Sequence, residues 1–170
     1  MIMKAKLIVE GKEFPIEIQD PMLKELLMPK KKTGYERAKD RERYYTIASD
    51  FIIGERTEKF LVIDDVTYNV ANYYSDKTVA ENNARADKLM RQLRRFAVEH
   101  RDNKVDWNNA NQRKYFIDYN SSNDELGAAY SVLHNYFGVI YFDTEKAAKL
   151  AIETFHDELI WYFTEYKDSL

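Results

Sequence analysis

Residues 72–81 read Asn-Tyr-Tyr-Ser-Asp-Lys-Thr-Val-Ala-Glu, and residues 140–149, at an offset of 68, read Ile-Tyr-Phe-Asp-Thr-Glu-Lys-Ala-Ala-Lys. In both stretches an aromatic strand end leads through a capping residue into a helix that carries alanine. Aromatic segments stand at similar places upstream, at 44–47 and 115–117. We interpret the chain as two copies of one strand–strand–helix unit. The alternative is a chance likeness between two strand-to-helix junctions.

Each copy is predicted to end in an amphipathic helix. Within 76–100, apolar residues recur at three- and four-residue steps and share one helix face: Ala86, Leu89, Met90, Leu93, Phe96 and Ala97. The final helix, capped by Asp143 or Thr144, repeats the pattern with Ala147, Ala148, Ala151, Ile152, Phe155 and Leu159. A small sheet that is apolar on one face needs a helix laid over it, so each helix is expected to cover the sheet of its own copy.

The strands are predicted from runs of aromatic and β-branched residues. In the first copy they lie at 44–49 and 51–56, with 67–74 as a third strand or extended segment. In the second copy they lie at 115–119 and 137–142. Residues 126–134 between them fit either a strand or an apolar helical turn.

The N-terminal region has a different pattern. Residues 4–18 alternate apolar and polar positions around a turn at 10–12, which predicts a β-hairpin. Asp20 then caps a short helix that starts with Pro21, and the charged stretch from residue 29 ends it. Residues 29–43 show no apolar periodicity and are interpreted as a connector that carries positive charge.

The sequence therefore predicts an α+β fold. An N-terminal β-hairpin and short helix are followed by two tandem β-β-(β)-α units, whose antiparallel sheets are each covered by a long amphipathic helix. The expected divisions are the hairpin and short helix at 1–28, the basic connector at 29–43, the first unit at 44–105 and the second at 106–170.

Several classes of function are disfavoured by what the sequence lacks. It has no cysteine, which excludes a thiolate metal site and a cysteine nucleophile and fits a reducing cytosol. No stretch approaches the roughly 18 apolar residues that span a bilayer, and the N-terminus alternates rather than forming a signal peptide. We expect a cytoplasmic protein that does not bind membranes.

Catalytic and metal-binding patterns are also weak. The three histidines, at 100, 134 and 156, have no ligand-like spacing, and no glycine-rich phosphate loop is present. The acidic pairs at 64–65, 124–125 and 157–158 are expected to face water. We therefore expect no enzyme, no cofactor and no metal site, and an enzyme ranks last among the alternatives.

Charge is distributed unevenly along the chain. Residues 106–170 hold 11 acidic and 5 basic residues, a net charge of −6, whereas residues 1–105 hold 18 acidic and 21 basic residues, a net charge of +3. Such a polarised molecule can steer partners of either sign. The alternative is that a difference of this size between two halves is ordinary.

The candidate binding residues are basic and aromatic. They are Lys30, Lys31, Lys32, Tyr35 and Arg37 in the connector, and Lys88, Arg91 and Arg95 on the exposed face of the helix at 76–100. Such side chains bind phosphates and stack on bases, which predicts contact with a partner or with nucleic acid. The alternative is a solvated connector and helix face, because interleaved acids such as Glu36 and Asp40 weaken the field.

The order of these segments resembles a family of small accessory proteins of bacteriophages and prophages of Gram-positive bacteria. The likeness lies in the hairpin at 6–14 (Lys-Leu-Ile-Val-Glu-Gly-Lys-Glu-Phe), the short Leu-rich helix, the stretch Lys-Lys-Thr-Gly-Tyr-Glu-Arg at 31–37, and Tyr-Tyr-Thr-Ile at 44–47. Residues 141–148, Tyr-Phe-Asp-Thr-Glu-Lys-Ala-Ala, are similar to the Tyr-Phe-x-Thr-x-x-x-Ala helix start of those proteins.

This resemblance implies a phage-encoded, non-enzymatic binding protein that inhibits a host defence system. Anti-CRISPR proteins that act on type II nucleases belong to this class, so the implied partner is a host CRISPR effector nuclease, its guide RNA or both, in the cytoplasm of the host bacterium. A homodimer is possible, because exposed aromatic residues on edge strands can pair two chains. The alternative is a phage accessory protein that binds single-stranded nucleic acid.

Overall fold

The structure is a computed structural model of the 170-residue chain, and it describes residues 3–10, 12–19, 22–23 and 32–166. Contacts between Cα atoms divide the chain into two compact parts, Met1–Glu36 and Arg37–Leu170. We call them the N-terminal part and the C-terminal part. The division falls inside the connector expected over 29–43.

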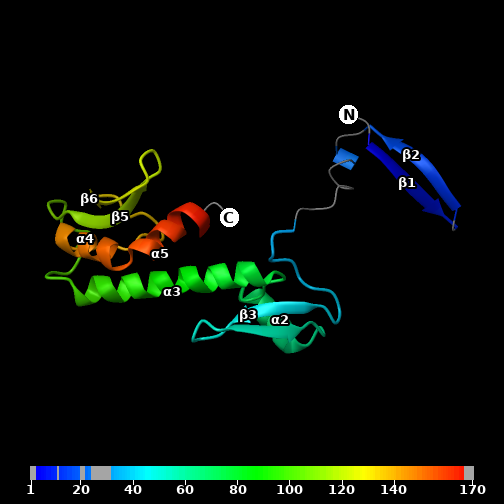
Figure 1. Ribbon diagram of the computed structural model, residues 1–170, viewed down its shortest axis with the longest axis horizontal. Coiled ribbons are helices and arrows are strands. Elements are labelled where there is room, and N and C mark those ends of the chain that lie inside the picture. Colours follow the sequence, from blue (N-terminus) through cyan, green and yellow to red (C-terminus); the bar gives the residue numbers. More distant parts are fainter. Residues whose placement is uncertain (1–2, 11, 20–21, 24–31, 167–170) are drawn as a thin grey trace. The chain divides into compact units, whose positions relative to one another are not determined.

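The N-terminal part contains the predicted hairpin. Strand β1 (Met3–Val9) pairs antiparallel with β2 (Lys12–Ile18) (Figure 1). In this pairing Leu7 lies opposite Phe14. The side chain of Ile18 is buried, whereas those of Leu7 and Phe14 are half exposed. Of the short helix predicted after Asp20, the structure describes residues 22 and 23, which are helical, and the rest lies outside the described residues.

The C-terminal part contains two repeats of the predicted unit, which confirms the fold class. The first repeat consists of β3 (Arg43–Ile47), β4 (Ile53–Thr57), α2 (Val62–Asn69) and α3 (Lys77–Glu99). The second consists of β5 (Lys114–Asn120), β6 (Glu125–Ser131), α4 (Glu145–Thr154), α5 (His156–Trp161) and the π-helical turn η1 (Tyr162–Tyr166). Both hairpins, β3–β4 and β5–β6, are antiparallel.

Each repeat contains one further backbone contact, and the two contacts are equivalent. In the first repeat, Tyr45 and Tyr74 exchange two backbone hydrogen bonds of 2.8 and 3.0 Å as an isolated antiparallel bridge. In the second repeat, Tyr115 and Phe142 do the same at 2.8 and 2.7 Å. Tyr74 and Phe142 stand at the offset of 68 that relates the two sequence stretches. The segment before each helix is therefore anchored to the first strand of its hairpin.

The strands predicted at 67–74 and 137–142 are too long, because each of these segments forms only the single bridge described above. Within 67–74, residues up to Asn69 belong to α2, whose apolar residues Val62, Ile63 and Val66 follow helical rather than alternating spacing. Residues 137–141 form no strand, and Gly138 there has a φ of 77°, which interrupts an extended chain. Aromatic residues favour strands in both segments, but tertiary context overrides that preference.

The predicted inner faces of the long helices are confirmed. Asp76 caps α3 by accepting hydrogen bonds from the backbone N–H groups of Thr78 and Val79, and Thr144 caps α4 through the N–H of Ala147. One apolar core joins the two helices through the buried residues Leu89, Leu93, Phe96, Phe142, Ala147, Ala148, Ala151 and Leu159. The final helix changes direction at Phe155, where α4 ends and α5 begins.

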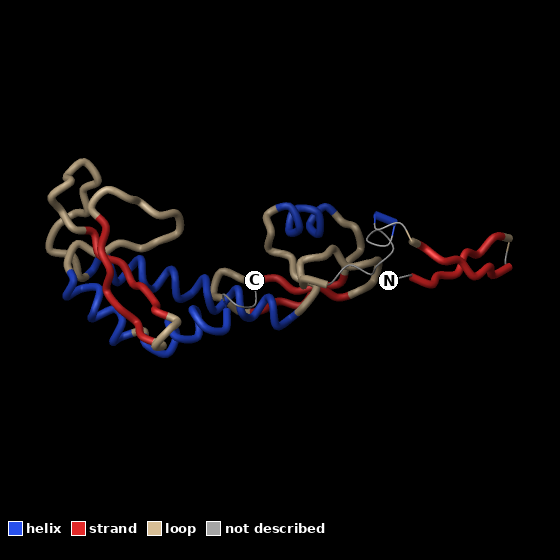
Figure 2. Tube along the Cα trace, turned by 90° about the horizontal axis from the view of Figure 1, so that it is seen from above, coloured by secondary structure: helices blue, strands red, loops and turns tan. Residues whose placement is uncertain are grey.

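Helix α3 connects the two repeats. It contacts β3 and β4 of its own repeat and also α4 and η1 of the second repeat, while α4 contacts β5 and β6. Figures 1 and 2 show the β3–β4 hairpin between α3 on one side and α2 on the other. None of the helices that the structure describes is long and apolar enough to cross a bilayer.

Replacing Leu93 by Ala tests the shared core. Leu93 is buried between the repeats, so the cavity should lower the free energy of unfolding by about 2–5 kcal/mol. The control is Arg95→Ala, because Arg95 is exposed on the other side of α3 and its change should stay within about 0.5 kcal/mol. Urea unfolding followed by circular dichroism measures both. Equal, small effects of the two substitutions would contradict this core.

Candidate functional site

Helix α2 turns its apolar side outward and its polar side inward. Asp64 and Thr67 are 3% and 8% exposed, whereas Val62 and Val66 are 79% and 49% exposed. Successive helical residues are 100° apart, which places the two valines on one side of α2 and the two polar residues on the opposite side. Water-exposed apolar residues that share a helix face, with a buried carboxylate beneath them, are unusual and require a physical cause.

The first cause is the set of hydrogen bonds to Asp64. Its Oδ1 atom accepts a 2.6 Å hydrogen bond from the Tyr44 hydroxyl, and its Oδ2 atom accepts bonds from the backbone N–H groups of Lys59 and Leu61 at 3.1 and 3.0 Å. The bond from Tyr44, helped by the backbone bonds, lowers the pKa of Asp64. Burial, together with this bond, raises the pKa of Tyr44 to about 12. Asp64 therefore stays ionised and Tyr44 stays protonated at neutral pH.

The second cause is Glu58, which is fully buried beside α2. Its two oxygens accept hydrogen bonds from Arg37 Nε (3.1 Å) and Nη2 (3.3 Å), from the Tyr73 hydroxyl (2.8 Å) and from the backbone N–H of Phe60 (2.7 Å). Burial alone raises the pKa of Glu58, but the bonds from Arg37 and Tyr73 outweigh it, and the pKa is lowered. The carboxylate is thus charged, buried and fully paired.

These groups form what we call the buried polar network: Arg37, Tyr44, Glu58, Asp64 and Tyr73. The Tyr44 and Tyr73 rings stack with centroids 4.0 Å apart, and the Tyr73 hydroxyl also accepts a bond from the N–H of Ala38. Arg37 reaches α2 itself, because its Nη2 lies 2.7 Å from Asp65 Oδ1. Hydrogen bonding to Glu58 and Asp65 raises the pKa of Arg37. The network holds α2 by its polar side, which leaves the apolar side facing water.

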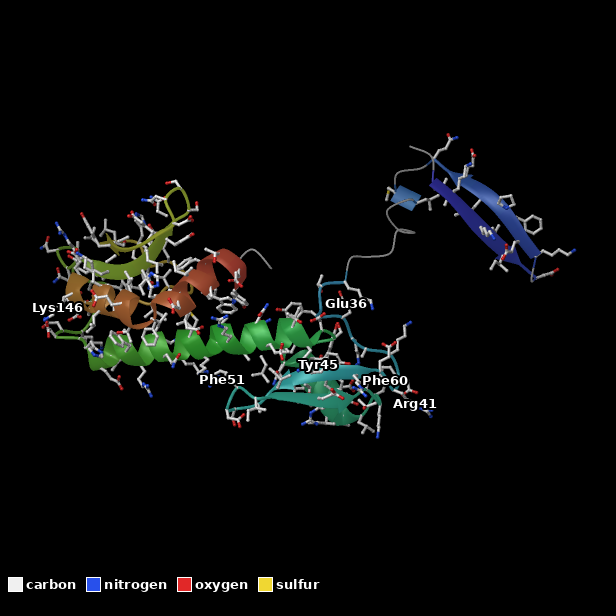
Figure 3. The ribbon with its side chains drawn as sticks, viewed as in Figure 1. Glu36, Arg41, Tyr45, Phe51, Phe60 and Lys146 are labelled. Carbon is white, nitrogen blue, oxygen red and sulfur yellow. The ribbon has the colours of Figure 1, made fainter. Side chains whose placement is uncertain are left out.

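The outward side carries a set of exposed apolar residues, which we call the α2 surface. Its members are all about half exposed or more: Phe60, Leu61, Val62, Ile63, Val66 and Val70. Figure 3 shows Phe60 near Arg41, at the opposite end of the β3–β4 hairpin from Phe51. Arg41 and Lys59 are exposed at the border of the surface. Apolar patches with a polar rim mark interaction sites on soluble proteins.

The structure separates the five connector residues that were predicted to bind a partner into three groups. Lys30 and Lys31 lie outside the described residues. Lys32 and Tyr35 are exposed in the N-terminal part. Arg37 belongs to the buried polar network, where its guanidinium is already bonded to Glu58 and Asp65.

The three basic residues predicted to line the exposed face of α3 do lie on that face. Lys88, Arg91 and Arg95 are all exposed, as expected from the helical spacing. The guanidinium of Arg91 lies over the Phe51 ring, 4.8 Å from its centroid, and Arg95 Nε lies 3.6 Å from a carboxylate oxygen of Glu99. Two of the three cations therefore already have an intramolecular partner.

Sequence reasoning missed the α2 surface, although a signal for it exists. The run Phe-Leu-Val-Ile at 60–63 is followed by Val66 and Val70 at helical spacing, with Asn69 as a polar residue on the same side. The expectation that the acids at 64–65 face water is wrong for Asp64, which is buried, and correct for Asp65, which is exposed. Asp64 is drawn inward because Tyr44 and two backbone N–H groups need its oxygens.

Within the described part of the chain, no group of three or more His, Asp or Glu side chains is placed to hold a metal ion. Comparison of the chain with protein-family models, with curated proteins and with solved structures found no match. The case for a function therefore comes from the site itself.

Replacing Tyr73 by Phe tests the buried polar network. The change removes the donor to Glu58 and leaves the N–H of Ala38 without its acceptor, so the free energy of unfolding should fall by about 1–3 kcal/mol. Tyr68→Phe is the matched control, because Tyr68 is exposed and packs its ring against Tyr73. Chemical denaturation measures both variants. A Tyr73→Phe effect no larger than that of the control would show that the network does not hold α2.

Proposed function

We propose that this protein is a binding protein without a catalytic site, and that it docks onto another protein through the α2 surface. The observation that carries the proposal is the reversed orientation of α2. Ionised groups that are buried and fully paired fix this helix with its valines outward. An apolar face that is rigidly presented to water is preorganised for docking, because little further ordering is needed on binding.

The composition of the surface indicates the chemistry of the partner. Its centre is uncharged and apolar, which matches the centre of a protein interface, where each apolar side chain that becomes fully buried contributes about 1.5–3 kcal/mol. Its border carries the exposed cations Arg41 and Lys59. Arg41 Nε lies 3.6 Å from an oxygen of the exposed Asp40, and the acid Asp65 on α2 is paired with Arg37. The complementary partner is therefore a protein with an apolar groove and an acidic rim.

The resemblance to phage accessory proteins supplies the first target to test. It supports an inhibitor of host defence, with a type II CRISPR nuclease or its guide-RNA complex as the bound species. Binding of single-stranded nucleic acid has weaker support, because Arg37 and Arg95 are paired with acids and Arg91 lies over Phe51. Protein docking is therefore the preferred function.

The test is co-expression with a type II nuclease that is programmed against a resident plasmid. The wild-type protein should protect the plasmid, and the double variant Val62→Asp with Val66→Asp should lose protection by at least ten-fold in plasmid survival. Both valines are exposed, so the charges should disturb docking rather than folding. The matched control is Val98→Asp, which should protect like the wild type, because Val98 lies on α3 and its exposure of 56% falls between those of Val62 and Val66.

Two outcomes would overturn parts of this proposal separately. Full cleavage in the presence of the wild-type protein would exclude the tested nuclease as the target. Protection that persists in the folded double variant, with thermal unfolding by circular dichroism unchanged, would exclude the α2 surface as the docking site.

A further inference from the structure

The edge of β5 that faces away from β6 forms only one backbone bridge, between Tyr115 and Phe142. The N–H and C=O of Tyr115 point away from β6 and bond to Phe142. Along a strand these groups alternate sides, so the N–H and C=O of Ile117 point the same way as those of Tyr115. Nothing in the described part of the chain bonds to these two groups of Ile117. The edge of β5 therefore offers one donor and one acceptor in strand geometry.

The first repeat closes the corresponding edge with a side chain. Ile47 lies two residues after the bridging Tyr45, as Ile117 lies two residues after Tyr115. The N–H of Ile47 donates to Oδ1 of Asn72 at 2.7 Å, and Nδ2 of Asn72 donates to the C=O of Ile47 at 2.9 Å. The Asn72 amide thus takes the place of a neighbouring peptide group and caps the edge of β3.

The second repeat lacks this cap. The offset of 68 places Ile140 where the first repeat has Asn72. Isoleucine carries neither a donor nor an acceptor, so it cannot bond to Ile117. The N–H and C=O of Ile117 are therefore left without the cap that Asn72 provides for Ile47.

A pocket of about 380 Å³ lies against this open edge. Phe116, Ile117 and Asp118 form one wall, residues 137–140 form the opposite wall, and α3, α5 and η1 close the remainder. The pocket thus lies between β5 and the segment 137–140, which pair at Tyr115 and Phe142 but not beyond that bridge. Its lining is apolar or aromatic apart from Asp118, and its volume falls in the range of about 300–1,000 Å³ that is usual for ligand pockets.

We propose that this edge and pocket bind an extended peptide segment of another protein, with alternating apolar and basic residues, as a strand added to β5. The peptide backbone bonds to the N–H and C=O of Ile117 and continues the ladder that Tyr115 and Phe142 begin. Successive side chains of an added strand alternate faces. Apolar side chains enter the pocket on the side of Ile117, which packs toward the helices, and basic side chains lie on the side of Asp118.

Charge supports a basic rather than an acidic peptide. Asp118 is exposed, and no cation among the described residues forms an ion pair with it. It is the one charged residue in the described lining of the pocket. The surrounding sequence, residues 106–170, has 11 acidic and 5 basic residues, a net charge of −6. Electrostatic attraction therefore favours lysine or arginine at alternate positions.

The binding test uses a fluorescein-labelled octapeptide of alternating lysine and valine, with anisotropy as the readout. We expect saturable binding to the full chain. An otherwise identical peptide that is N-methylated at its central valines should bind at least ten-fold more weakly, because it cannot form the strand bonds.

Two protein variants test the site. Asp118→Lys should weaken peptide binding several-fold, and Ile140→Asn, which introduces the cap seen in the first repeat, should weaken it at least ten-fold. Because Ile140 packs against the core, the N-methylated peptide and Asp118→Lys decide the matter if Ile140→Asn unfolds.

Amide hydrogen exchange measured by NMR locates the contact. The amide of Ile117 should exchange rapidly in the free protein and become protected when the unmodified peptide is added. The amide of Phe116, whose partner in β6 is Ala129, should be protected in both states.

Three results would each overturn the proposal. They are no saturable binding, equal affinity for the N-methylated peptide, and an Ile117 amide that is already protected without peptide, as pairing with a second copy would cause. None of these outcomes depends on the α2 surface.

Discussion

The hydrogen bond from the buried Tyr44 hydroxyl to the Asp64 carboxylate, at 2.6 Å, fixes how α2 sits on its hairpin. If α2 rotated to bury its valines, the hydroxyl of Tyr44 and the N–H groups of Lys59 and Leu61 would lose their acceptor. Each buried polar group left unpaired costs about 1–3 kcal/mol. Glu58 strengthens the constraint, because a buried carboxylate is tolerated only when it is paired and hydrogen-bonded. The apolar α2 surface is the consequence of satisfying these polar groups.

The two repeats solve the same backbone problem in different ways. Each anchors the segment before its helix to the first strand of its hairpin, through Tyr74 or Phe142. The first repeat then caps the strand edge with Asn72, whereas the second has an uncapped edge at Ile117 with a pocket beside it. Because α3 packs against both repeats, the two surfaces are carried by one core. The differences between the two repeats thus produce the two surfaces for which we propose binding, on a single scaffold.

The sequence predicts those features that depend on local spacing. The inner faces of α3 and α4, their caps and the hairpins follow from periodicity and turn residues within a few positions. The orientation of α2 does not, because it depends on Arg37, Tyr44, Glu58 and Tyr73, whose contacts join residues 15 to 35 positions apart. The prediction of Arg37 as a partner-binding residue illustrates the difficulty, since an arginine in a basic run gives no sign that its partner is a buried glutamate. The open edge at Ile117 likewise becomes visible only when the two repeats are compared in space.

The orientation of α2 can be measured directly with single cysteines, because the chain has none of its own. Val62→Cys and Thr67→Cys place one thiol on each side of the helix, and the rate of modification by a maleimide reports the access of water to each. The account predicts that the thiol at position 62 reacts nearly as fast as in the unfolded chain, and that the thiol at position 67 reacts at least ten-fold more slowly. A protected thiol at 62 together with a reactive thiol at 67 would show that α2 buries its apolar side, and would contradict the account.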